Sequence, residues 1–162
     1  MNAEQHQRSR TIDAPASAIF ALLADPDRHQ ETEPTGWVRG AIDPAPITAV
    51  GQVFAVNMHL ERLGGPYVMH NKVTVFEPDQ AIAWAPGQLN RHGELKTGGW
   101  VWRYDLEPVG ATAGCDDATR VTLTYDWSAT PQKVRDGFAA WPVLGADLLE
   151  DSLAALDRAI TA

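Results

Sequence analysis

The fold of this chain is decided by the stretch GWVWRYDLEPVGATAGCDDATRVTLTYDWS, residues 99–128. Its first part places large apolar residues at every second position, namely Trp100, Trp102, Tyr104 and Leu106. Its second part repeats this alternation at Val121, Leu123, Tyr125 and Trp127. Successive residues of a β-strand point to opposite faces of a sheet. We therefore predict two strands, each with an aromatic face and a mostly polar face, joined by a loop over residues 108–118.

These two strands are expected to pair as an antiparallel hairpin. The register that brings the two aromatic faces together has the pairs Leu106–Val121, Trp102–Tyr125 and Trp100–Trp127. It also places Arg103 diagonal to Asp126 on the polar face, within reach of a salt bridge. A slip of one residue would mix polar and apolar side chains on both faces.

A second hairpin is predicted around Gly64-Gly65-Pro66. If Leu60 lies opposite Met69, one face collects Phe54, Val56, Met58, Asn71, Val73 and Val75. The other face then carries Asn57, His59, His70 and Lys72. The inward face is apolar except for Asn71, and a buried amide needs hydrogen-bond partners or water.

The remaining segments complete an α+β pattern. The predicted strands are Glu4–Ile12, Trp37–Ile42, Gln52–Arg62, Tyr67–Glu77, Ala81–Ala85, Gly99–Glu107 and Arg120–Ser128. Glycine and proline pairs such as Pro86-Gly87 separate them. After the first strand, Asp13-Ala14-Pro15 predicts the start of a helix that stops at Asp25-Pro26. A short helical turn over residues 27–31 follows and ends before Pro34.

The C-terminal segment has helical spacing. Leu149, Leu153, Leu156 and Ile160 are separated by four, three and four positions, which places them on one helix face. We expect Pro142 in the first turn of this long helix and a shorter helix over residues 132–140. The sheet must cover its apolar face, and this helix is the only predicted element long enough to do so. The order predicts a helix-grip fold of about seven strands, as one domain over residues 1–162.

Composition excludes several classes of function. The net charge is -8 with only 13 lysines and arginines, which disfavours nucleic acid and anionic membranes as partners. No stretch approaches the roughly 20 apolar residues needed for membrane insertion, and the N-terminus does not resemble a secretory signal. One cysteine excludes an internal disulfide. We expect a cytoplasmic protein without a cofactor.

The aromatic face has two interpretations. Six tryptophans are about three times the number that average composition gives. They could fill a solid core, or they could form the wall of a cavity. Tyrosine and tryptophan carry polar ends that need partners when buried, and Asn71 faces the same way. We favour the cavity, because pockets for small ligands are mostly apolar with a few placed polar groups.

The chain resembles START-like (SRPBCC) domains, the superfamily of polyketide cyclases/dehydratases and lipid-transport proteins. The opening stretches Ile12–Pro15 and Ile19–Pro26 are similar to the start of such domains. Trp102–Pro108, Thr119–Thr122 and Tyr125–Ser128 resemble their last two strands, and Ser152–Leu156 resembles the closing helix. The stretch Asp25–His29 is similar to a form common among uncharacterised actinobacterial members. The resemblance covers nearly the whole chain and specifies fold more than function.

The resemblance implies a deep cavity between the long helix and the sheet. The implied ligand-binding positions on the sheet are Trp84, Trp100, Trp102, Tyr104, Tyr125 and Trp127, with Met58, Met69 and Asn71 deeper in. The terminal segment adds Phe138, Trp141, Leu148 and Leu149. No catalytic signature of the cyclases can be transferred, so the catalytic residues are unknown.

Histidines supply two further candidates. His59 and His70 would be cross-strand neighbours in the predicted register, with Glu61 as the only nearby third ligand. Zinc needs at least three protein ligands, and alternation places both histidines on the solvent face, so no metal site is predicted. His29 follows the first helix near the expected cavity rim. It could act as an acid or base there, although a packing role in the helical turn is favoured.

Two loops carry the last candidates. The stretch Arg91–Glu94 could close over the cavity as a lid, but a solvated loop is favoured. Cys115 is expected in the loop beside Asp116-Asp117, with no partner that suggests a nucleophile.

Three functions are therefore considered. The first is binding of a small hydrophobic ligand, such as a lipid or polyketide, without chemical change. The second is a polyketide cyclase/dehydratase-type enzyme, which needs a titratable group inside the cavity. The third is a chaperone-binding adaptor, which needs a large exposed apolar patch. A free edge strand also leaves a homodimer open. The first function is favoured because it needs only the cavity.

Overall fold

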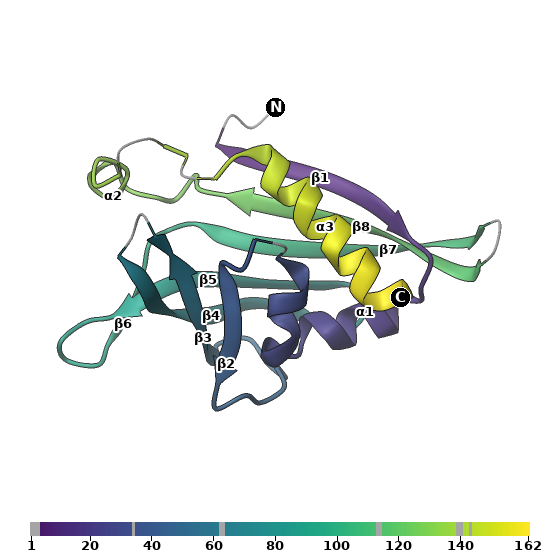
Figure 1. Cartoon of the computed structure of the whole chain (residues 1–162), viewed down its shortest axis with the longest axis horizontal. Helices are drawn as coiled ribbons and strands as arrows, with labels where there is room; N and C mark the ends of the chain where they lie inside the picture. Colours follow the sequence, from purple (N-terminus) through teal and green to yellow (C-terminus); the bar gives the residue numbers. More distant parts are fainter. Residues whose placement is uncertain (1–3, 34, 62–63, 113–114, 139–140, 143) are drawn as a thin grey trace.

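The computed structural model describes residues 4–33, 35–61, 64–112, 115–138, 141–142 and 144–162. Within them, eight strands form one curved antiparallel sheet in the order β1-β8-β7-β5-β4-β3-β2, with the short β6 paired to β5 (Figure 1). The strands are β1 (Gln5–Ile12), β2 (Val38–Ile42), β3 (Val53–Leu60), β4 (Gly65–Glu77), β5 (Ala81–Leu89), β6 (Leu95–Thr97), β7 (Val101–Thr112) and β8 (Cys115–Asp126). The predicted α+β helix-grip fold is confirmed.

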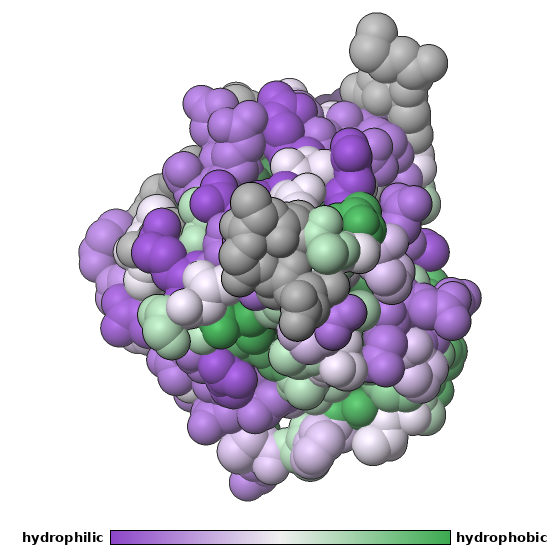
Figure 2. All heavy atoms as spheres, turned by 90° about the vertical axis from the view of Figure 1, so that its right-hand side faces the viewer, coloured by the Kyte–Doolittle hydropathy of each residue, from purple (hydrophilic) through white to green (hydrophobic). Residues whose placement is uncertain are grey.

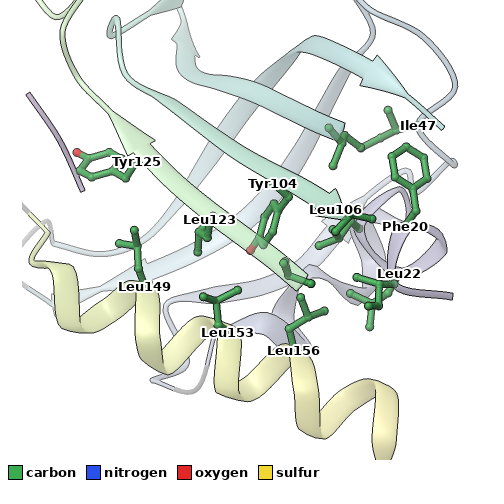
Figure 3. Close-up of a cluster of buried hydrophobic side chains, with 14 of the residues drawn as sticks. Phe20, Leu22, Ile47, Tyr104, Leu106, Leu123, Tyr125, Leu149, Leu153 and Leu156 are labelled. Atoms are coloured by element: carbon green, nitrogen blue, oxygen red, sulfur yellow. The ribbon is translucent and has the colours of Figure 1, made fainter. Parts of the chain in front are cut away.

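The long helix α3 (Ala146–Thr161) lies across the sheet beside β1 and β8 (Figure 1). Two ion pairs join it to β1: Arg8 Nε to Glu150 Oε1 at 2.9 Å and Arg10 Nε to Asp157 Oδ2 at 2.7 Å. Leu149, Leu153 and Leu156 point from α3 toward the sheet (Figure 3), and each is at most 2% exposed. The spacing of four and three residues therefore marks the buried face, as predicted.

Two short helical segments connect β1 to β2. Helix α1 (Ala16–Leu23) follows Pro15, which is its N-cap residue, and buries Ile19, Phe20, Leu22 and Leu23. The 3-10 helix η1 (Pro26–Thr32) has Asp25 as its N-cap, whose carboxylate accepts from the Asp27 amide. The side-chain cap explains Asp25, and Pro26 stands in the first turn of η1, where its missing N–H is tolerated; Pro15 is the N-cap of α1 rather than its first helical residue. Helix α1 and the 3-10 helix η1 together place residues 26–33 under α3.

The β7–β8 register is the predicted one. Leu106 lies opposite Val121 and Trp102 lies opposite Tyr125. The polar face differs from the prediction, because Arg103 bonds Asp105 on its own strand, with Nε to Oδ2 at 2.9 Å. Residues two apart share a face, so this nearer carboxylate takes the guanidinium instead of Asp126.

The β3–β4 register differs from the prediction by four residues. Phe54 lies opposite Asn71, and Leu60 lies opposite Gly65, not Met69. An even shift leaves every side chain on its predicted face, so Phe54 and Asn71 still point inward. The one exception follows an irregularity between Val73 and Val75, after which Phe76, rather than Val75, packs against the core.

Four predicted boundaries were wrong. β5 continues through Pro86-Gly87, where it leaves β7 and takes β6 as its neighbour. A Cβ on Gly87 would lie 2.4 Å from the Lys96 carbonyl oxygen, so glycine permits the close approach of β6. The predicted loop over 108–118 is instead largely strand, and its register shifts around Gly110, whose φ is +79°. Helix α3 begins after Gly145, not at Pro142, and the shorter helix α2 spans only Gln132–Arg135.

Candidate functional site

A cavity of about 720 Å³ lies against the inner face of the sheet. Its walls come from β3, β4, β5 and β7, from η1, from the segment between α2 and α3, and from the first turns of α3. Leu148 and Ser152 line it, whereas Leu149, Leu153 and Leu156 fill the core on another face of the same helix (Figure 3). Closely packed side chains therefore fill one end of the interior between the sheet and α3, and the cavity occupies the other end.

Most residues that the resemblance suggested lie on this wall. They are Met58, Met69, Asn71, Trp84, Trp100, Trp102, Tyr104, Tyr125, Phe138, Trp141 and Leu148. Trp127 does not line the cavity but packs edge-on against His6 of β1, with ring centroids 4.8 Å apart. Leu149 is fully buried in the core. Trp127 directly follows β8 and its amide bonds the Glu4 carbonyl oxygen next to β1, and α3, which carries Leu149, is joined to β1 by the two ion pairs.

The aromatic rings of the wall form three groups. The first contains His29, Phe54, Trp84 and Tyr104. The second contains Trp102 stacked on Tyr125 at 4.5 Å, with Trp127 behind it. The third contains Trp100, Phe138 and Trp141. Strand alternation orients the sheet rings toward the cavity, η1 supplies His29, and the connection between α2 and α3 supplies Phe138 and Trp141.

His29 is the titratable group of the first ring group. It is 6% exposed, and its ring stacks on Trp84 with centroids 4.8 Å apart and 16° between the planes. Its Nε2 lies 2.7 Å from the carbonyl oxygen of Leu23. Burial lowers the pKa of His29 below 6.5, and the hydrogen bond to Leu23 offsets part of that shift. The ring is therefore neutral at pH 7, with Nε2 as the protonated nitrogen because a carbonyl oxygen only accepts.

Acid is expected to destabilise the fold through His29. Because its folded-state pKa is below its ordinary value, the unfolded chain binds more protons as the pH falls below about 6.5. Neutral His29 therefore contributes its full stabilisation of the fold above about pH 6.5. Between that pH and the folded-state pKa, the free energy of unfolding decreases by up to about 1.4 kcal/mol per pH unit. Urea unfolding at pH 7 and pH 5 should show a larger decrease for wild type than for His29→Phe. Equal decreases would contradict this role.

Glu33 is a second ionisable group in the wall, and it is 7% exposed. Its carboxylate accepts hydrogen bonds from the amide and hydroxyl of Thr35, at 3.0 and 2.7 Å, and from the Trp37 amide at 2.8 Å. These donors compensate the loss of water around the charge. Sequence analysis did not identify Glu33, because it lies in an irregular segment without strand or helix periodicity.

Neutral polar groups occupy the rest of the interior. Burial raises the pKa of Tyr104 to about 12 even though the Thr32 hydroxyl lies near it. Burial alone raises the pKa of Tyr125 to about 12. Tyr67 accepts a hydrogen bond from Trp37 Nε1 at 2.6 Å. Both phenols with raised pKa values stay protonated at pH 7. The Thr32 hydroxyl donates its own proton to the His29 carbonyl oxygen at 2.8 Å, so Tyr104 donates to Thr32, and Tyr125 is the phenol that can donate to a guest molecule.

The other candidates lie away from the cavity. His59 faces Pro66 and bonds Glu61 at 2.6 Å, while His70 faces Ala55, so the two histidines are not cross-strand neighbours. Within the described part of the chain, no three His, Cys, Asp or Glu residues come together as metal ligands do.

Residues 91–94 form an exposed turn closed by the Asn90 side chain. Cys115 begins β8 rather than lying in a loop, and its side chain is outside the described residues.

None of the helices among the described residues has the length and apolar character required to cross a bilayer.

Relatives support the architecture. An uncharacterised protein of Mycobacterium tuberculosis is 32% identical over 138 residues, which are 85% of this chain and 54% of that protein. The chain thus spans about half the length of the curated relatives it matches. The crystal structure of a Nitrosomonas europaea protein superposes with a TM-score of 0.68 at 14% identity, covering 99% of this chain and 97% of that one. The solution structure of the Aha1 dimer from Colwellia psychrerythraea gives 0.57 at 16% identity, covering 96% and 95%.

The structural likenesses are below 25% identity and show the shared fold. The family comparison is more specific, because it aligns residues 4–161 with one family over almost the whole chain. Together with the helix-grip architecture and the ring-lined cavity, this match shows that the chain belongs to the polyketide cyclase / dehydrase and lipid transport family.

Proposed function

We propose that this chain binds a small hydrophobic ligand in the cavity between the sheet and α3. The observation that carries the proposal is a partly open cavity of about 720 Å³ whose wall is made mainly of aromatic and aliphatic side chains. That volume is within the range of about 300–1,000 Å³ found for pockets that hold drug-sized molecules. The family description, which names lipid transport, agrees with this use of the fold.

The proposal predicts that the protein carries its ligand through purification. Protein isolated from its own host should be measured by native mass spectrometry and, after denaturing extraction, by mass spectrometry of the extract. We expect a bound small molecule that is released on denaturation. Absence of any such molecule, combined with failure of the folded protein to take up the neutral dye Nile red, would contradict the proposal.

A second candidate is an enzyme of the cyclase or dehydratase type. Such an enzyme needs an acid or base inside the cavity, and His29 and Glu33 both lie in the wall. A neutral imidazole can accept a proton from a substrate near pH 7. Conversion, rather than release, of the co-purified molecule by the protein and not by His29→Phe would favour this function.

The adaptor function finds less support. The large apolar side chains that are exposed among the described residues are Ile42, Val50, Val53, Leu89 and Val109. The end of the molecule that carries the β7–β8 hairpin is mostly hydrophilic, with small apolar areas (Figure 2). The homodimer stays a prediction. β1 and β2 are the edge strands of the sheet, and a second copy of the chain would pair with one of them.

A further inference from the structure

One end of the cavity brings two polar side chains to the same aromatic ring. His29 contacts Phe54 edge-on, with ring centroids 5.3 Å apart. Asn71 lies directly opposite Phe54 on the neighbouring strand and points to the same face. Trp84 stacks on His29 and also contacts Phe54 at 5.5 Å. His29 and Asn71 thus flank one aromatic corner, which we call the Phe54 corner.

At this corner His29 offers a hydrogen-bond acceptor. Its Nε2–H is held by the Leu23 carbonyl oxygen at 2.7 Å, so the neutral ring carries its lone pair on Nδ1. The hydrogen bonds of this ring in the described part of the chain use Nε2 only. The tautomer is therefore set by the backbone of the preceding helix, and Nδ1 is left for a guest.

Asn71 offers a second acceptor. Its Nδ2 is directed to two backbone carbonyl oxygens, those of Met69 at 3.4 Å and Phe54 at 3.5 Å. Because an amide group has its donor and acceptor on opposite branches, this orientation leaves Oδ1 as the free branch. Asn71 is 5% exposed and lines the cavity. An amide oxygen in a cavity wall that loses water to a guest needs a donor in its place, so the corner favours a guest that brings a donor.

The charge of the wall restricts that guest further. Among the described residues, the cavity lining holds one carboxylate, the buried Glu33, and one ammonium group, Lys96, which is exposed on β6. Glu33 follows η1, the segment that carries His29, and the whole chain carries a net charge of -8, so the corner favours an uncharged head group over an anionic one. The surrounding rings of Phe54, Trp84 and Tyr104 favour an aromatic guest, which stacks on them or meets them edge-on.

We propose that the Phe54 corner recognises the hydroxyl group of an uncharged phenolic ligand, which donates a hydrogen bond to His29 Nδ1 or Asn71 Oδ1 while its ring lies against Phe54 and Trp84. This inference rests on the proposed function, since it names the class of molecule that the cavity selects.

Three matched probes test it by isothermal titration calorimetry at pH 7.5: 2-naphthol, 2-methoxynaphthalene and decahydro-2-naphthol. The methoxy compound keeps the rings but lacks the donor, and the saturated alcohol keeps the donor but lacks the aromatic rings. We expect wild type to bind 2-naphthol about tenfold more tightly than either analogue, which corresponds to about 1.4 kcal/mol.

Two variants locate the selectivity. Asn71→Leu and His29→Phe each remove one acceptor, and the preference for 2-naphthol over the methoxy compound should fall to about threefold or less in the variant that lacks the acceptor used by the hydroxyl. Asn57→Leu, on the exposed face of β3 and outside the cavity lining, is the matched control for Asn71→Leu and should keep the tenfold preference. A ratio of affinities is insensitive to a modest loss of stability, and circular dichroism verifies that each variant is folded.

The outcomes separate this inference from the proposed function. Equal binding of 2-naphthol and 2-methoxynaphthalene by wild type, or a preference that both corner variants retain, would overturn the phenol assignment and leave cavity binding intact. Equal binding of 2-naphthol and its saturated analogue would overturn the aromatic part of it. Failure of all three probes and of Nile red to bind the folded protein would overturn both.

Discussion

Replacing Leu156 with alanine is expected to lower the free energy of unfolding by about 2–5 kcal/mol. Leu156 is 0% exposed and lies on the α3 face that contacts the sheet (Figure 3). Its truncation removes buried apolar surface and leaves a void in the part of the molecule that is closely packed. Urea unfolding followed by circular dichroism measures the change.

Ser152 provides the matched control, because it lies one turn earlier on the same helix and faces the cavity. Ser152→Ala should change the free energy of unfolding by less than about 0.5 kcal/mol, since it leaves no new void in packed core and alanine favours helix. Similar losses for Leu156→Ala and Ser152→Ala would contradict the division of α3 into a core face and a cavity face.

Replacing Trp102 with alanine is expected to weaken binding of a hydrophobic ligand by about tenfold to a hundredfold. The indole stacks on Tyr125 with ring centroids 4.5 Å apart and forms part of the cavity wall. Its removal takes away contact surface worth about 1.5–3 kcal/mol to a bound molecule, and every 1.4 kcal/mol is a factor of ten in affinity. Titration with Nile red, or with the co-purified ligand, measures the loss.

The free energy of unfolding of the Trp102→Ala protein shows whether Trp102 lines the cavity or belongs to the packed core. Trp102 is only partly buried, and one side of its ring faces empty space. The loss in free energy of unfolding should therefore be smaller than that of Leu156→Ala, although the side chain is larger. Trp102→Phe keeps an aromatic surface and should restore most of the affinity. A large loss of stability without a loss of binding would show that this ring is core.

These two expectations follow from the way the elements divide the interior. Near β1 and α1, leucines of α3 meet Leu106, Leu123 and Phe20 in one continuous cluster (Figure 3). Around the cavity, η1 packs against β2 and β3, Trp141 contacts Trp100 next to β7, and α3 contributes only its first turns. Stability and binding should therefore respond to different sets of substitutions.

The faces of the elements were determined by the sequence alone. Alternation in residues 99–128 predicts the inward rings of β7 and β8, and the spacing of Leu149, Leu153 and Leu156 predicts the buried face of α3. Both periodicities are local, because they follow from the rise and rotation per residue of one element. For the same reason the β3–β4 prediction kept its faces although its register was four residues off.

Only the tertiary structure decided what the faces enclose. His29 was expected near the cavity rim, but Glu33 stands in a segment without periodicity, and both reach the cavity because η1 folds under α3, far away in the sequence. The cavity volume was likewise decided only by the tertiary structure, because it depends on how completely side chains from five or more elements fill the space between them. The periodicity of an element predicts which of its faces is buried. It contains no information on the distance from that face to the element on the other side of the interior.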